Sequence, residues 1–168
     1  MSGPLTGIRV IEIGALIAAP FAARLMAEFG AQVIKIESPD GGDPLRKWRK
    51  LYEGTSLWWY VQSRNKQSLT LNLKHPQAQE VFRKLIAEAD ILIENFRPGV
   101  LEKLGLGWDV LHALNPRLVM VRLSGFGQSG PLKDQPGFGA VGESMGGLRY
   151  ITGFEDRPPV RTGISIGD

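Results

Sequence analysis

Short apolar, β-branched runs alternate with segments of helical periodicity along most of this chain, and this alternation constrains the fold more than any other feature. Apolar runs of this kind are typical of strands buried on both faces of a sheet. The expected strands are 8–13, 32–37, 68–73, 90–96 and 117–124. Helices are expected over 20–30, 76–89, 98–104 and 108–114, and the first three begin at proline. Strands alternating with helices predict a Rossmann-like α/β fold, a mostly parallel sheet flanked by helices.

The last part of the chain, from Gly125 onward, is rich in glycine and more weakly patterned. A weak helix is expected near 140–148 and a strand-like segment over 162–166. With 43% hydrophobic residues, the chain is too apolar to be a disordered polypeptide. Its 168 residues suit one ordinary domain, and no repeat or interdomain linker is evident, so we expect a single domain.

Composition excludes several kinds of chemistry. The chain has no cysteine, which rules out disulfides, a thiolate nucleophile and cysteine-ligated metals. Its two histidines, His75 and His112, are expected to be structural, so no metal site is predicted. The first ten residues do not resemble a secretory signal, and the longest apolar run, 15–23, is too short to cross a membrane. We expect a cytoplasmic protein without a membrane partner.

The positive charge is concentrated in one segment. Residues 41–75 carry seven Lys and Arg against two Asp and Glu, whereas the whole chain has a net charge of +3. Tryptophan and tyrosine side chains are interleaved with these cations. Such a segment suits an anionic ligand with a flat ring, such as a nucleotide or a single-stranded nucleic acid. A solvated basic loop is the alternative, and composition alone leaves both open.

Two short motifs resemble known sites but lack the context that their chemistry requires. Residues 125–130 match G-x-G-x-x-G, yet Pro131 follows at once and no helix is expected to start there, as a dinucleotide site would need. Residues 142–146 match the G-x-S-x-G nucleophile elbow, but no histidine follows Ser144 to act as its base. Neither motif is expected to be a site of that kind.

Several longer stretches together resemble the class III CoA-transferase family, also called CaiB/BaiF. The stretches are PLTGIRVIEI, FGAQVIKIESPDGGDPLR, NKQSLTLNLK, ADILIENFRPGVLEKLGLG, NPRLVMVRLSGFGQSGP and PPVRTGISIGD, and they span nearly the whole chain. The resemblance implies the large domain of an enzyme whose chains form interlocked homodimers. Members are longer than this chain, so residues 1–168 would be the amino-terminal portion, without the second domain.

The resemblance also implies where coenzyme A would bind, as a substrate rather than a tightly bound cofactor. The matching positions are Ile17, Ala18, Leu71, Asn72, Leu73, Lys74, Asn95, Phe96, Arg97, Lys103, Pro136, Gly137, Phe138 and Gly139. One position departs from the pattern, because Ser38 stands where formyl-CoA transferase, a member of the family, has an arginine. No nucleic acid partner is implied.

The family's nucleophilic aspartate corresponds to Asp168, which would form an aspartyl-CoA thioester while coenzyme A moves from an acyl-CoA to a small carboxylic acid. Arg149, Arg157 and Arg161 suggest a dicarboxylic acceptor, with succinyl-CoA as a candidate donor, although they could instead make surface or dimer contacts. A 2-methylacyl-CoA racemase is an alternative, but Phe138 stands in the stretch where racemases have their histidine. A third possibility is a non-catalytic remnant that binds coenzyme A, and we expect the 168-residue chain alone to be nearly inactive.

Overall fold

A computed structural model describes residues 3–164, 166 and 167, and it divides into two compact units, Met1–Leu123 and Ser124–Asp168. Asp168, the expected nucleophile, therefore lies outside the described residues. The two units are described in turn.

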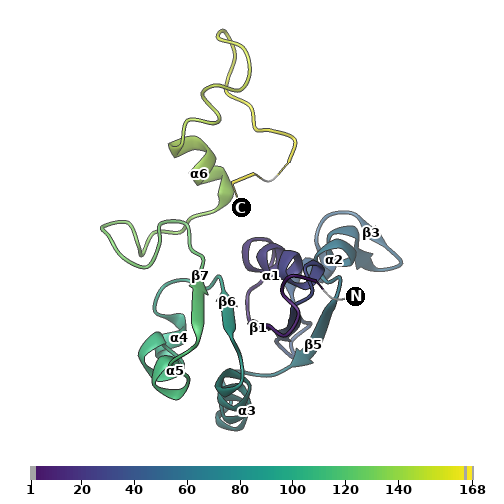
Figure 1. Cartoon of the computed structure of the whole chain (residues 1–168). Coiled ribbons are helices and arrows are strands. Elements are labelled where there is room, and N and C mark those ends of the chain that lie inside the picture. Colours follow the sequence, from purple (N-terminus) through teal and green to yellow (C-terminus); the bar gives the residue numbers. More distant parts are fainter. Residues whose placement is uncertain (1–2, 165, 168) are drawn as a thin grey trace. The chain divides into compact units, whose positions relative to one another are not determined.

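The first unit is built on a five-stranded parallel sheet (Figure 1). Its strands are β1 (Arg9–Glu12), β2 (Gln32–Glu37), β5 (Lys66–Thr70), β6 (Ile91–Glu94) and β7 (Val119–Arg122). Their order across the sheet is β5-β2-β1-β6-β7, and every neighbouring pair is parallel. The predicted Rossmann-like α/β fold is confirmed. The chain builds outward from β1 to β5, and then returns to the other side of β1 to form β6 and β7. The boundary between β1 and β6 is thus a topological switch point, where open α/β sheets place their ligands.

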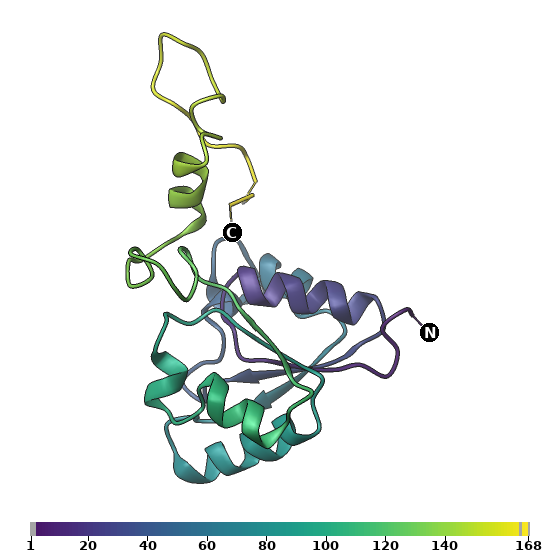
Figure 2. The ribbon, with the colours of Figure 1, turned by 60° about the vertical axis from the view of Figure 1, so that its left-hand side comes forward.

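Helices cover both faces of this sheet, as Figure 2 shows. On one face, α1 (Ala18–Glu28) packs its alanines at 19, 23 and 27 against Val10 and Val33. The opposite face is covered by α3 (Pro76–Ala87) and α5 (Trp108–Leu114), whose buried side chains surround Ile11 and Leu92. Val10 and Ile11 point to opposite faces because successive strand residues alternate. Both faces of the strands are therefore buried, which explains their nearly continuous apolar runs.

The basic, aromatic segment between β2 and β5 forms small elements that the sequence pattern did not indicate. They are the 3-10 helix η1 (Pro44–Lys47), β3 (Leu51–Tyr52), β4 (Thr55–Ser56) and α2 (Leu57–Gln62). Within the segment, the guanidinium of Arg46 lies 3.9 Å from the ring centre of Trp59, and that of Arg49 lies 4.5 Å from Trp48 and 5.4 Å from Trp58. Two of the cations in this segment thus pair with tryptophan rings of the same segment.

Among the described residues of the second unit, the regular element is one short helix, α6 (Gly139–Met145). The prediction of a strand over 162–166 is wrong for the part of that range that the structure describes. There the chain bends at Gly163, and the Ile166 amide bonds locally to the carbonyl of Ile164 at 3.1 Å. A strand needs a neighbour for its backbone groups, and none of the described residues supplies one.

The two doubtful motifs also lie in this unit, and neither has the local structure that its chemistry requires. No helix begins at 125–130; instead Gly125 meets Gly137 so closely that an added Cβ would overlap the opposite backbone. Ser144 lies inside α6, where its hydroxyl donates to the carbonyl of Ala140 at 2.9 Å. It is a helical serine and not a nucleophile elbow.

Candidate functional site

A cavity of about 370 Å³ opens at the carboxyl ends of the sheet strands. It is bordered by the segments that follow β1, β2, β5 and β6 and by the short helix α4 (Val100–Lys103). Its apolar wall comprises Ile13, Ile36, Leu71, Leu73, Phe96, Val100 and Leu104, whereas Ser38, Asn72 and Lys74 add polar groups. Asn72 and Lys74 are exposed. An apolar hollow with a cation at its border suits an extended organic molecule that carries negative charge.

The loop after β1 is fixed across the switch point. The Asn95 carboxamide, just beyond β6, accepts from the Ala15 amide and donates to the Ala15 carbonyl, both at 2.8 Å. Gly14 is required beside it, because an added Cβ would overlap Ala19 and come within 2.7 Å of Asn95 Oδ1. Leu16 follows with a φ of +63°, a left-handed conformation that is uncommon for a residue with a side chain. These contacts therefore hold the loop that borders the cavity in one backbone conformation.

Beneath this loop lies a buried network of four charged residues. Lys35 Nζ lies 2.6 Å from Glu12 Oε1 and 2.8 Å from Asp43 Oδ2. Lys66 Nζ lies 2.7 Å from the other oxygen of Glu12 and donates to the Pro20 carbonyl at 2.7 Å. Burial lowers the pKa of Lys35, but Glu12 and Asp43 outweigh burial and leave that pKa above its usual value. Lys35 is therefore a permanently charged group inside the protein.

Asp43 connects this network to the backbone of two loops. Its Oδ1 accepts from the Leu16 amide at 3.0 Å and from the Leu45 amide at 2.8 Å, where it caps η1. Lys35 also donates to the Gly14 carbonyl at 2.8 Å. The lysine of β2 and the aspartate that follows β2 thus hold the loop that follows β1.

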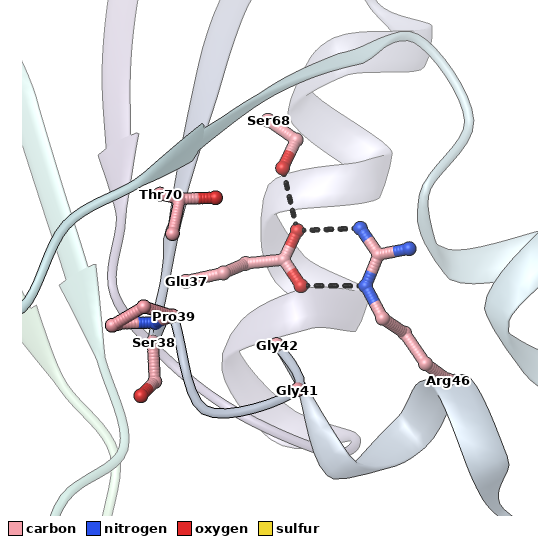
Figure 3. A pocket seen from close by; sticks show the side chains of 8 residues that line it. All are labelled: Glu37, Ser38, Pro39, Gly41, Gly42, Arg46, Ser68 and Thr70. Carbon is pink, nitrogen blue, oxygen red and sulfur yellow. Dashed lines mark hydrogen bonds and ion pairs between the residues drawn. The ribbon is translucent and has the colours of Figure 1, made fainter.

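A second hollow of about 280 Å³ adjoins the first and shares Glu37, Ser38 and Gly42 with it. Figure 3 shows that Arg46 meets Glu37 through two nitrogens, with both donor–acceptor distances at 2.8 Å, while Ser68 donates to the same carboxylate at 2.7 Å. Burial raises the pKa of Glu37, but the hydrogen bonds from Arg46, Ser68 and the Asp43 amide outweigh it and lower that pKa to about 2. Glu37 is therefore ionised and fully engaged within the chain.

A third ion cluster joins β6, β7 and α4. Arg122 Nε lies 2.7 Å from Glu94 Oε1, and Arg122 Nη1 lies 2.7 Å from Glu102 Oε1. Glu94 also accepts from the Phe96 amide at 2.6 Å. Burial raises the pKa of Glu94, and Arg122 offsets this only in part. The cluster holds α4 beside the strand ends, where Val100 and Leu104 border the cavity.

The structure brings together some of the residues that the family resemblance implied. Leu71, Asn72, Leu73, Lys74 and Phe96 border the cavity, and Asn95 fixes its loop. Ile17 and Ala18 follow that loop without bordering the cavity, since Ile17 packs against Leu45 and Trp59 and Ala18 begins α1. Arg97 and Lys103 are exposed near its border, Lys103 at the end of α4. Residues 136–139 belong to the second unit and lead into α6.

The arginines expected to bind an acceptor have mixed surroundings. Arg149 lies 3.3 Å from the buried carboxylate of Glu143, which occupies part of its hydrogen-bonding capacity. Arg157 stacks on Phe154 and lies 3.8 Å from Asp156. Arg161 is exposed. His75 caps α3 by accepting from the Gln77 amide at 3.3 Å, and His112 stacks on Trp108.

The sequence pattern did not lead us to predict Glu12, Lys35 and Asp43 as site residues. A signal for Glu12 and Lys35 was present in the sequence, because each charge interrupts an apolar strand that is buried on both faces. Such charges require a buried partner.

Among the residues the structure describes, no group of three or more His, Asp or Glu could hold a metal ion. Nor is any described helix long and apolar enough to cross a membrane.

Comparisons of the sequence and the structure with known proteins point to one family. The model of CoA-transferase family III matches residues 5–168. Succinyl-CoA--D-citramalate CoA-transferase of Chloroflexus aurantiacus is 57% identical over 166 residues, covering 98% of this chain and 41% of that protein. Succinate--glutarate CoA-transferase of Agrobacterium fabrum is 38% identical over 172 residues, covering 98% and 43%. A crystal structure of a CAIB/BAIF family protein from Brucella suis has a TM-score of 0.93 and 36% identity, covering 98% of this chain and 45% of that one. The chain thus spans about two fifths of the length of these curated relatives.

Proposed function

The chain belongs to CoA-transferase family III, and from that premise we propose that it forms the amino-terminal, coenzyme A-binding part of an enzyme that moves coenzyme A between carboxylic acids. The observation that carries the proposal is the cavity at the switch point. Segment 71–74 and Phe96, which the family resemblance implies as coenzyme A contacts, border one hollow although they come from distant parts of the chain.

The chemistry of coenzyme A matches this hollow. Its thiol-bearing arm is long and largely apolar, which suits the wall formed by Leu71, Leu73 and Phe96. Its phosphates require positive charge, which Lys74 would supply at the border of the hollow. Arg97 and Lys103 are exposed and adjoin in sequence Phe96 and Leu104, which border the hollow, so they would add to this charge. Coenzyme A enters and leaves as a substrate in this proposal and is not a resident cofactor.

The reaction that we propose uses Asp168 as the nucleophile. Its carboxylate attacks the carbonyl carbon of an acyl-CoA, the C–S bond breaks, and a mixed anhydride and CoA thiolate result. The thiolate attacks the aspartyl carbonyl, releasing the first carboxylic acid and leaving an aspartyl-CoA thioester. The acceptor carboxylate then attacks this thioester, and CoA thiolate takes the acceptor acyl group from the second anhydride. Asp168 is regenerated, and no oxidant or metal is consumed.

Succinyl-CoA as donor and a dicarboxylic acid as acceptor are the substrates that we propose. Relatives named for succinyl-CoA with citramalate and for succinate with glutarate support this choice. Within the chain, Arg157 and Arg161 are cations exposed enough to meet a second carboxylate, whereas Arg149 is partly committed to Glu143. The enzyme would act as a homodimer, following the family.

Two alternative functions, a racemase and a non-catalytic remnant, predict different experimental results. A racemase must remove an α-proton, and Phe138 cannot accept one. A non-catalytic remnant would bind coenzyme A without forming a covalent intermediate. Translating the DNA beyond codon 168 separates a fragment from a remnant, because only a fragment continues in frame.

The test is a transferase assay on the complete gene product with succinyl-CoA and a panel of citramalate, malate, glutarate, itaconate and oxalate. We expect transfer to at least one dicarboxylate, loss of transfer in Asp168→Ala, and a hydroxylamine-trapped adduct on Asp168. The 168-residue chain alone should show little turnover. Full turnover in Asp168→Ala, or α-proton exchange on a 2-methylacyl-CoA, would overturn the proposal.

A further inference from the structure

Leu16 is held in a conformation that its side chain disfavours, directly after Gly14 and Ala15, which border the cavity. Its φ of +63° lies in the left-handed region, where a Cβ crowds the backbone. Leucine rarely occupies this region unless the surroundings impose it, and such positions concentrate at functional sites. The surroundings of Leu16 therefore need an explanation.

Three polar side chains hold the loop in this conformation, one on β2 and two in the segments that follow β2 and β6. Asn95 bonds both backbone groups of Ala15, Lys35 binds the Gly14 carbonyl, and Asp43 accepts from the Leu16 amide at 3.0 Å. Asp43 is itself fixed by Lys35 at 2.8 Å and by the Leu45 amide at 2.8 Å. Lys35 and Asp43 are buried, with side chains 2% and 1% exposed.

We propose that Lys35 and Asp43 are positioning residues, which act on ligand binding through the Gly14–Leu16 loop. Both border the cavity, but their charged atoms are engaged by the chain's own groups, so they hold the loop in its shape. The inference rests on the proposed binding of coenzyme A for its functional readout. The structural part of the inference, that Asp43 holds the Gly14–Leu16 loop in its conformation, does not depend on coenzyme A binding.

The first experiment measures amide hydrogen exchange and coenzyme A affinity in the complete gene product. In Asp43→Ala the Leu16 amide loses its acceptor, so we expect exchange at residues 14–16 to become at least about tenfold faster, with α3 unchanged. Coenzyme A affinity should fall by roughly tenfold. The control is Glu88→Gln, which removes the exposed ion pair with Arg9 and should change neither quantity.

A rescue experiment separates positioning from general stability. Glycine adopts positive φ without steric cost, so Leu16→Gly added to Asp43→Ala should restore at least part of the lost affinity. A protein that is merely less stable would not regain affinity from a second substitution of this kind.

A further variant leaves the buried charge network intact, in case Asp43→Ala does not fold. Leu16→Val places a β-branched residue at positive φ, where it fits worse than leucine, and should weaken coenzyme A binding several-fold.

Unchanged exchange at 14–16 in Asp43→Ala, or wild-type affinity in Leu16→Val, would overturn the inference. So would weakened binding without faster exchange, since that result indicates direct contact with the ligand. If the wild-type chain binds no coenzyme A, the proposed function fails, while the exchange data still decide whether Asp43 holds the loop.

Discussion

Asn95 satisfies both backbone groups of Ala15 through one carboxamide, with Nδ2 donating to the carbonyl and Oδ1 accepting from the amide, each at 2.8 Å. The two residues are 80 positions apart and follow the two strands that meet at the switch point. The pair therefore couples the loops of β1 and β6, and it sets the shape of the cavity border between them.

Asn95→Asp tests this coupling with almost no change in size. The variant keeps the acceptor for the Ala15 amide but loses the Nδ2 donor, so a carboxylate oxygen faces the Ala15 carbonyl. We expect a loss of about 1–3 kcal/mol in the free energy of unfolding and a clear drop in coenzyme A affinity. Urea unfolding and calorimetric titration measure the two effects. Wild-type values for both would show that the pair is incidental.

Gly14→Ala tests the close approach beside that pair. The added Cβ would overlap Ala19 and crowd Asn95 Oδ1, so α1 or the Asn95 side chain must move. We expect weaker coenzyme A binding and a loss of roughly 1–3 kcal/mol in stability. The matched control is Gly142→Ala in α6, where an added Cβ meets nothing within 4 Å and helix propensity improves. Equal behaviour of the two variants would contradict the packing argument.

Glu12→Gln tests the buried charge network. The substitution leaves Lys35 with Asp43 as its only nearby carboxylate and removes the carboxylate partner of Lys66. Removing one partner from a buried ion pair destabilises by about 3–5 kcal/mol. Glu28→Gln, which affects more exposed pairs with Arg24 and Arg64, should cost less than about 1 kcal/mol. Thermal or urea unfolding compares them, and similar small losses would show that the network is unimportant for stability.

The Glu37–Arg46 pair predicts how stability depends on pH. Because the pKa of Glu37 is lowered from 4.5 to about 2 by folding, its stabilising contribution is complete above the unfolded pKa and is lost as pH falls from about 4.5 to 2. Arg46→Met should cost about 1–2 kcal/mol at pH 7, and the difference from wild type should shrink over that acid range. Arg64→Met is the exposed control. A difference that stays constant from pH 7 to pH 2 would show that the pair does not titrate as described.

Much of the fold could be predicted because buried parallel strands leave a strong pattern. The predicted strand 32–37 coincides with β2, and the predicted helix 108–114 coincides with α5. The prediction for the third strand, 68–73, lies too far along the chain, since β5 is Lys66–Thr70. The reason is physical: β5 is a polar strand at the sheet edge, whereas Leu71 and Leu73 leave the sheet to form the cavity wall.

The site was less accessible to sequence reasoning because its parts meet only through topology. The apolar pattern places Lys35 in a buried strand, but it cannot show that its partners are Glu12 on the adjacent strand and Asp43 in a following loop. Likewise, no local pattern indicates that Asn95 reaches Ala15. The elements of segment 44–62 were missed for a different reason, because each is only two to six residues long and too short to show a periodic pattern of burial.

The proposed function depends on coenzyme A binding in the switch-point cavity. Hydrogen exchange of the complete gene product with and without saturating coenzyme A, read peptide by peptide, tests this binding. We expect saturable binding, with slower amide exchange at 14–16, 71–74 and 96–104. The exchange rate in the part of α3 distant from the cavity should not change. Absence of saturable binding, or protection that leaves those three segments unchanged, would contradict binding in this cavity.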